Sequence, residues 1–434
     1  MSEKAVPYRA LVVALLMAVM VISILDKTIF AFAGVQIMDE LKLSPEQFGL
    51  VGSSFFFLYS LSGTLVGFLA NRYPARWILA VMALVWSTAQ LLVTVAGSLG
   101  ALTASRLLLG AGCGPGTAVT QHACFKWYAP AEHALPAALV QVSIMLGGLL
   151  GALTLPFIIS HFGWRVAYLA LAGLSLAWVI AWLLFGAEGR QAREESQPST
   201  EPAVPYRRLL LNRTFVWVCV MCFLAYLPNA LSFSWSAVYM QKGLGLSAMQ
   251  AGYLMFGATL GIIVLNLAMA ALSRRLTSKG ASLHRRLVLP PMMCCVIGGL
   301  AFCAMGTVLT SLPGKLGAYM AGAVLLNALF AYGMTICSHL SPVRQRGAVL
   351  AIHVGSMTLS GMVAPWAVGR LVGVLGGDIA RGFEISVQVM GAVTVLCALI
   401  GFYLITPAIS HARMRARSKP AESNSAVETA ARVL

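Results

Sequence analysis

Twelve long apolar segments are the feature that most limits how this chain can fold. A helix that crosses a bilayer needs about 20 apolar residues. Lipid offers no water to unpaired backbone groups, so segments of this length without alternating polarity are expected to be helices. They form two groups of six, at residues 10–35, 45–70, 77–96, 100–125, 135–159 and 165–185, and at 215–239, 247–272, 288–309, 315–337, 347–375 and 383–405. The sequence therefore predicts an all-α membrane protein with twelve transmembrane helices.

The composition excludes a soluble globular protein. Of 434 residues, 59% are hydrophobic and 10% are charged, whereas soluble domains have about 25% charged residues. The cysteines lie in or beside apolar stretches, which argues against a disulfide scaffold. The stretch 31–33 superficially matches a signal-peptide cleavage site, but Asp26 and Lys27 interrupt the apolar run before it. The first segment is therefore expected to be a span.

The distribution of positive charge along the chain indicates on which side of the membrane the termini lie. Lys and Arg number 30 against 14 Asp and Glu, a net charge of +16, which in a soluble chain would suggest a nucleic-acid partner. With twelve spans, 22 basic residues fall on the side that holds both termini, and six fall on the other side or at span ends. Cytoplasmic loops collect Lys and Arg. We therefore expect a multi-pass protein of the inner (plasma) membrane with cytoplasmic termini and no nucleic-acid partner.

The two groups of six segments look like copies of one another. Residues 43–49 and 246–252 lie 203 positions apart, and each reads as a Ser N-cap followed by Gln at the third helical position. The same shift maps residues 69–72 onto 272–275, where each helix meets a basic loop. The predicted organisation is a six-helix bundle over 1–186, a cytoplasmic linker over 187–212, a second bundle over 213–407 and a disordered cytoplasmic tail over 408–434. Parallel halves of this kind are typical of secondary transporters, which hold substrate near the middle of the membrane.

Local motifs make the sequence similar to the major facilitator superfamily. The loop 67–76 resembles the signature between the second and third helices of that superfamily, with Asn71 where an Asp is usual. The glycines and Pro156 in the fifth segment resemble its Gly/Pro-rich fifth helix. The resemblance implies two pseudo-symmetric six-helix bundles and assigns Gly67, Asn71, Arg72 and Arg76 to a conformational loop.

Within the superfamily the chain most resembles the anion:cation symporters, which carry sugar acids, phthalate-like acids and other organic anions. The matching features are Asp26-Lys27, Leu43-Ser44 with Gln47-Phe48-Gly49, Tyr59, residues 106–110, and residues 127–130 followed by Glu132. One departure concerns coupling. Cys113 stands where symporters of that branch commonly have a Glu, so a proton-coupling carboxylate is missing there.

Three charged residues fall inside spans, and such charges are functional candidates by default because they cost at least about 2.5 kcal/mol each. They are Asp26, Lys27 and Arg106. A guanidinium can bind a carboxylate through two parallel hydrogen bonds, so Arg106 is predicted as the main substrate anchor and Lys27 as a second one. The alternative is that Arg106 pairs with Asp26 and only holds helices together.

Asp26 is the acidic residue well inside a span and is the leading candidate for proton coupling. Burial and neighbouring cations act in opposite directions on its pKa, so the sequence leaves its charge state open. A structural ion pair and a cation or substrate contact remain alternatives. On a helix, Lys27 points about 100° away from Asp26, so the two need not pair.

Neutral polar side chains are expected to complete the substrate cavity. The 203-residue shift maps Asp26 onto Asn229, which predicts charge in the first half and hydrogen-bonding groups in the second. A helix–helix hydrogen bond is the alternative role for each, and His353 could also relay a proton. The predicted lining residues are Tyr59, Gln141, Asn229, Asn327 and His353.

The sequence predicts a transporter of the alternating-access kind and no enzyme, cofactor or metal site. The partners expected are a small organic anion, the proton as coupling ion and the lipid bilayer, with the chain acting as a monomer. Proton-coupled symport of a carboxylate is the leading hypothesis. An anion exchanger and a drug or metabolite exporter of the same fold are the alternatives, and a non-transporting membrane sensor is a more remote one.

Overall fold

The structure is a computed structural model, which describes residues 5–69, 73–129, 132–189, 204–342 and 345–410. The first half of the chain forms α1 (Ala5–Glu40), α2 (Pro45–Leu69), α3 (Ala75–Thr94), α4 (Leu99–Cys113), α5 (Gly116–Phe125), α6 (Ala134–Phe162) and α7 (Trp164–Phe185). The second half forms α8 (Tyr206–Leu210), α9 (Arg213–Ser232), α10 (Trp235–Val238), η3 (Tyr239–Gly243), α11 (Ala248–Ser278), α12 (Leu283–Leu287), α13 (Leu289–Ala304), α14 (Leu312–Leu340), α15 (Arg346–Thr358), α16 (Ser360–Val374) and α17 (Ile379–Leu404).

The expected all-α membrane fold is confirmed. In the described part of the chain, 10 helical stretches are long and apolar enough to cross a membrane. Two expected spans are not among these ten. One is divided into the shorter helices α4 and α5, and the other is α13, which has 16 residues. The nine cysteines are all free, which agrees with the absence of a disulfide scaffold. Most of the linker and the tail from residue 411 lie outside the described residues.

The segment 100–125, expected as one helix, is divided between α4 and α5 at Gly114-Pro115. Pro115 has no N–H to donate to the preceding turn, so one hydrogen bond of the helical ladder is lost at this position. The glycines before the break bring α4 close to α2. A Cβ at Gly110 would overlap the carbonyl oxygen of Phe55, and one at Gly114 would overlap that of Tyr59. Gly110 and Gly114 therefore allow α4 to pack closely against α2.

The two predicted capping boxes are confirmed. The Ser44 N–H donates to Gln47 Oε1 at 2.9 Å, and the Gln47 N–H donates to Ser44 Oγ at 3.2 Å. The Ser247 N–H donates to Gln250 Oε1 at 2.8 Å, and the Gln250 N–H donates to Ser247 Oγ at 3.1 Å. Each pair satisfies two N–H groups that a helix start leaves free. The internal repeat therefore has the same local structure at α2 and α11.

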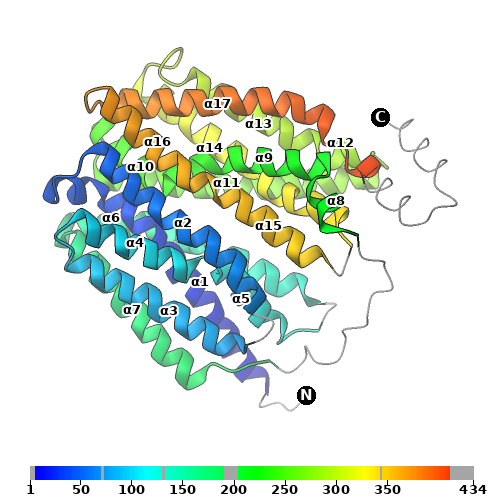
Figure 1. The fold of residues 1–434 in the computed structure, drawn as a ribbon, viewed down its shortest axis with the longest axis horizontal. Helices are drawn as coiled ribbons and strands as arrows, with labels where there is room; N and C mark the ends of the chain where they lie inside the picture. The colour runs from blue at the N-terminus through cyan, green and yellow to red at the C-terminus, as the bar shows by residue number, and fades with distance from the viewer. Residues whose placement is uncertain (1–4, 70–72, 130–131, 190–203, 343–344, 411–434) are drawn as a thin grey trace. The chain divides into compact units, whose positions relative to one another are not determined.

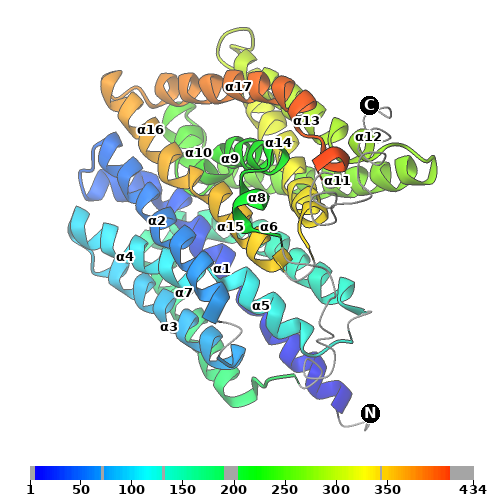
Figure 2. The ribbon, with the colours of Figure 1, turned by 45° about the vertical axis from the view of Figure 1, so that its right-hand side comes forward.

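Two compact units divide the chain. Unit 1 comprises residues 1–197, 230–259 and 361–383, and unit 2 comprises residues 198–229, 260–360 and 384–434. Within unit 1, α2 packs on α4, α3 on α7, and α1 on both α6 and α7. Figure 1 shows α3 beside α7, and Figure 2 shows α2 beside α4 from a second direction. Within unit 2, α13 packs on α14.

Candidate functional site

Asp26 lies in the interior of unit 1 and is held by an amide. Its exposed fraction is 0%. Gln90 on α3 donates a hydrogen bond from Nε2 to Asp26 Oδ1 at 2.7 Å. Among the described residues, Asp26 Oδ2 has no hydrogen-bond partner. One carboxyl oxygen is therefore fixed by a neutral donor, while the other keeps its full capacity to bind a proton or a donor.

Arg106 on α4 contacts two aromatic rings, and two of its guanidinium nitrogens have no hydrogen-bond partner among the described residues. The residue is 1% exposed. Its guanidinium carbon lies 4.4 Å from the ring centroid of Phe30 and 4.9 Å from that of Phe55. In the described part of the chain, its Nε and Nη1 atoms have no hydrogen-bond partner. The side chain is thus neither exposed to lipid nor consumed by backbone oxygens, and two N–H groups remain for an acceptor.

Lys27 points to a different neighbour from Asp26, as expected for adjacent helix positions. Its Nζ lies 5.0 Å from the ring centroid of Tyr59 on α2. The residue is buried. The five ion pairs found among the described residues do not include Asp26, Lys27 or Arg106. The alternative of a direct Arg106–Asp26 pair is therefore absent from this conformation.

Further buried polar atoms of unit 1 also lack hydrogen-bond partners among the described residues. Buried polar groups are normally satisfied by protein or ordered water, so each such atom needs an explanation. Sequence reasoning did not select these residues or Gln90, because the packing of the helices decides which polar side chains of the spans face the same interior. They are Ser23 Oγ, Trp86 Nε1, Thr120 Oγ1, Tyr168 OH and Ser175 Oγ.

The remaining predicted lining residues are dispersed. Gln141 lies on α6 in unit 1 and is exposed. Asn229 on α9 and Asn327 on α14 are half-buried in unit 2. His353 on α15, also in unit 2, is buried with Nδ1 3.5 Å from Cys219 Sγ, and its Nε2 has no hydrogen-bond partner among the described residues. Unit 1 thus brings Asp26, Lys27, Tyr59 and Arg106 to neighbouring helices. The roles of all the lining residues stay predictions.

The predicted conformational loop is only partly described. Gly67 lies in α2, whereas Asn71 and Arg72 lie outside the described residues. Arg76, at the start of α3, donates from Nη2 to the carbonyl oxygen of Leu183 at 2.6 Å. This bond joins α3 to the end of α7.

Glu188 caps the N-terminus of α3, where no N-cap side chain is present. Its carboxylate accepts from the Ala75 N–H at 3.1 Å and from the Arg76 N–H at 3.3 Å, and it pairs with Lys126. Burial opposes ionisation of Glu188. The Lys126 ammonium and the two backbone donors outweigh burial and hold the pKa of Glu188 below its ordinary value of 4.5.

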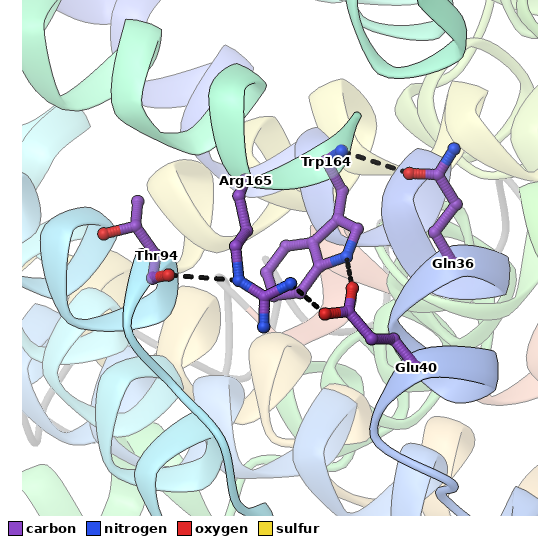
Figure 3. A network of polar contacts seen from close by, with 5 residues as sticks. All are labelled: Gln36, Glu40, Thr94, Trp164 and Arg165. Atoms are coloured by element: carbon purple, nitrogen blue, oxygen red, sulfur yellow. Dashed lines mark hydrogen bonds and ion pairs between the residues drawn. The ribbon is translucent and has the colours of Figure 1, made fainter. Parts of the chain in front are cut away.

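A polar network joins helices of unit 1 near the residue where α1 ends (Figure 3). Arg165 forms an ion pair with Glu40 and donates from Nε to the Thr94 carbonyl oxygen at 3.1 Å. Trp164 donates from Nε1 to Glu40 Oε2 at 2.7 Å, and its N–H donates to Gln36 Oε1 at 3.1 Å. These bonds tie α1 to the start of α7, and α7 to the end of α3, beside an open cleft of about 520 Å³. Its side chains are already paired, so we assign it a structural role.

Residues of the second sequence half that belong to unit 1 pack against α1 and α2 near the same end. A Cβ at Gly49 on α2 would overlap the carbonyl oxygen of Pro365 on α16, and a Cβ at Gly369 would overlap that of Pro45. Asp39 pairs with Lys242, and Arg370 donates to Glu46 at 2.9 Å. The α2–α16 crossing therefore has no space for side chains at Gly49 and Gly369.

Comparison with known proteins places the chain among transporters. A model of the Major Facilitator Superfamily matches residues 16–325. The hexuronate transporter of Bacillus subtilis (strain 168) is 29% identical over 236 residues, which cover 52% of this chain and 55% of that transporter. The probable sulfoacetate transporter of Cupriavidus necator is 26% identical over 251 residues, which cover 53% of this chain and 58% of the relative. The chain thus spans little more than half the length of these curated relatives.

A solved transporter structure has a similar fold. A bacterial homologue of the human lysosomal transporter Spinster, in an inward-facing and unoccupied conformation, has a TM-score of 0.78 at 17% identity and covers 94% of this chain and 98% of its own. At this identity the likeness shows the fold alone. The family and these relatives are transporters and not enzymes, as the sequence predicted. Because the family model covers most of the residues, the chain belongs to the Major Facilitator Superfamily.

Proposed function

We propose that this chain transports a small organic anion by alternating access, with Arg106 as the anchor of the anion. The observation that carries the proposal is the environment of its guanidinium. The guanidinium carbon lies over the rings of Phe30 and Phe55, and Nε and Nη1 have no acceptor among the described residues. A carboxylate can accept two parallel hydrogen bonds from a guanidinium, one from Nη2 and the other from either Nε or Nη1. Burial strengthens that bond, since water does not compete.

Charge balance supports an anionic substrate over a neutral one. Lys27 and Arg106 bring two positive charges to the interior of unit 1, and Asp26 brings one negative charge at most. Buried charge without compensation is costly. A bound carboxylate supplies the missing negative charge. The relatives named as hexuronate and sulfoacetate transporters carry compounds with acidic groups, which agrees with this class.

For coupling, we propose proton symport through Asp26. A carboxyl held in an ion pair is locked in its charged form, whereas Asp26 receives its hydrogen bond from the neutral amide of Gln90. An amide N–H can donate to a carboxylate and to the carbonyl oxygen of a carboxylic acid, so Asp26 keeps this bond in both states. Cys113 in place of a Glu favours anion exchange as the second candidate, since it removes one titratable carboxyl from the region.

The test is uptake into proteoliposomes of purified protein. Glucuronate, a hexuronate, and sulfoacetate serve as labelled probes within a panel of organic acids, with and without an imposed pH gradient. We expect Arg106→Ala to abolish uptake and Arg106→Lys, which loses the two-pronged edge, to reduce it at least about tenfold. Arg274→Ala, at an exposed position of α11, is the matched control. Normal uptake by Arg106→Ala at equal protein amounts would reject the anchor.

The imposed gradient separates the two coupling modes. Symport predicts that the pH gradient drives accumulation in the wild type and that Asp26→Asn loses accumulation while it still exchanges internal for external anion. Exchange predicts no response to the gradient in either protein. Accumulation by Asp26→Asn at the wild-type level would remove Asp26 from the coupling step.

A further inference from the structure

We propose that Gln90 is a positioning residue for proton coupling: its amide occupies Asp26 Oδ1 in both charge states of the carboxyl and leaves Oδ2 as the atom that binds and releases the proton. This inference rests on the proposed function, because it concerns how Asp26 acts as the coupling residue. Gln90 itself touches neither substrate nor proton.

The contact joins two helices, and the Ser175 hydroxyl of α7 is the other neutral polar group that interacts with the Asp26 carboxyl. Gln90 on α3 is 1% exposed, and its bond to Asp26 Oδ1 spans 64 positions of sequence. Asp26 Oδ2 has no hydrogen-bond partner among the described residues. An unpartnered oxygen beside a partnered one makes the two atoms of the carboxyl inequivalent. In the protonated acid, Oδ1 is then the carbonyl oxygen that accepts from Gln90, and Oδ2 carries the hydrogen.

The charged and titratable groups around Asp26 are arranged so that none of them replaces the amide. Lys27, on the same helix, lies over the Tyr59 ring, and Arg106 on α4 lies over the rings of Phe30 and Phe55. The other titratable groups that interact electrostatically with Asp26 are Cys113 of α4 and Tyr168 of α7.

The proton step follows from this geometry. A proton from the water on one side of the membrane adds to Oδ2 and converts the carboxylate to a neutral acid. Its release to the other side restores the carboxylate. The bond from Gln90 persists through both steps, so the carboxyl keeps one orientation while its charge changes. A charged donor at position 90 would instead hold Asp26 ionised.

Infrared difference spectroscopy of the reconstituted full-length protein, titrated with acid, tests this directly and needs no substrate. We expect the wild type to show the C=O stretching band of a protonated, hydrogen-bonded carboxylic acid, and Asp26→Asn to lose it. Gln90→Met removes the amide donor at nearly constant volume, so the Asp26 band should move to higher frequency, as for a carbonyl oxygen without a donor. The pH dependence of glucuronate or sulfoacetate uptake should change with it.

Two further variants make the result specific. Ser87→Ala is the matched control: Ser87 lies on the same helix and donates to the Ala172 carbonyl oxygen of α7 at 3.1 Å without touching Asp26. It should leave the band unmoved. If Gln90→Met does not fold, Gln90→Glu retains a hydrogen-bonding side chain, and a proton shared by the two carboxyls should move the band in the opposite direction.

The outcomes separate the two proposals. If Asp26→Asn keeps both the band and pH-driven accumulation, Asp26 is not the coupling residue and the proposed coupling fails. If Asp26→Asn loses both, but neither variant at position 90 moves the band or the pH dependence, only the role of Gln90 is overturned.

Discussion

At the scale of single residues, the three charges inside unit 1 have three different kinds of neighbour. Asp26 receives an amide hydrogen bond, Lys27 lies over one aromatic ring, and Arg106 lies over two. Such cation–π contacts stabilise a cation by about 0.5–2 kcal/mol without using its N–H groups. Lys27 and Arg106 are therefore buried against aromatic rings.

Sequence reasoning could identify these charges but not their neighbours. Asp26, Lys27 and Arg106 stand out because ionised groups are rare in apolar spans, and helix periodicity gave the divergence of Asp26 and Lys27. Gln90 could not be identified as the partner of Asp26, because the contact joins helices 64 positions apart and depends on how α1 and α3 pack.

Glu188 gives a prediction for the effect of pH on stability. Its pKa lies below 4.5 in the folded protein, so its contribution is present above the unfolded value and is lost as pH falls through the folded pKa. We expect Glu188→Gln to destabilise the protein by about 1 kcal/mol at neutral pH, the scale of a carboxylate at a helix N-terminus. Thermal unfolding in detergent across a pH series measures this.

The deficit of Glu188→Gln should shrink as the pH drops below about 4.5, since wild-type Glu188 then loses its charge too. Glu132→Gln, at an exposed position, is the control. A deficit that stays constant down to the acid limit would show that the charge of Glu188 contributes nothing.

At the scale of elements, sequence patterns over a few residues predicted local structure correctly, whereas contacts between distant helices could not be predicted. The capping boxes at Ser44 and Ser247 follow from residues three positions apart, and both were predicted correctly. The division of the fourth span at Pro115 was missed, because apolar length alone favours one continuous helix. The close α2–α16 contact has no signature in either helix, since glycine is common in membrane spans for several reasons.

That contact predicts the effect of adding one methyl group. We expect Gly49→Ala to force α2 away from the Pro365 carbonyl oxygen, at a cost of about 1–3 kcal/mol as in other overpacked sites. Spin labels at Lys42 and Val374, both exposed, should then report a longer distance by electron paramagnetic resonance.

Gly257→Ala is the matched substitution, because nothing lies within 4 Å of a Cβ there. It should leave the distance distribution unchanged and the helix slightly more stable. An unaltered distribution in Gly49→Ala would mean that the crossing relaxes without opening.

At the scale of the whole molecule, the hydropathy pattern alone was sufficient to predict the fold class. Twelve apolar segments and the lack of water in lipid leave little choice but a helical bundle. Unit 1 includes residues 230–259 and 361–383 of the second half, which the hydropathy pattern does not reveal. The site requires more than the pattern, because side chains such as Gln141 and His353 are placed by packing and not by hydropathy.

The unpartnered Nε and Nη1 atoms of Arg106 suggest a way to identify the proposed substrate. Donors without acceptors lower the stability of the empty protein, so the right anion should act as a stabiliser. At a hundredfold excess over its Kd, a ligand that binds only the folded state adds about 2.7 kcal/mol. A melting-temperature screen of organic acids should therefore single out the cargo before any transport is measured, and Arg106→Ala should melt at the same temperature with or without it.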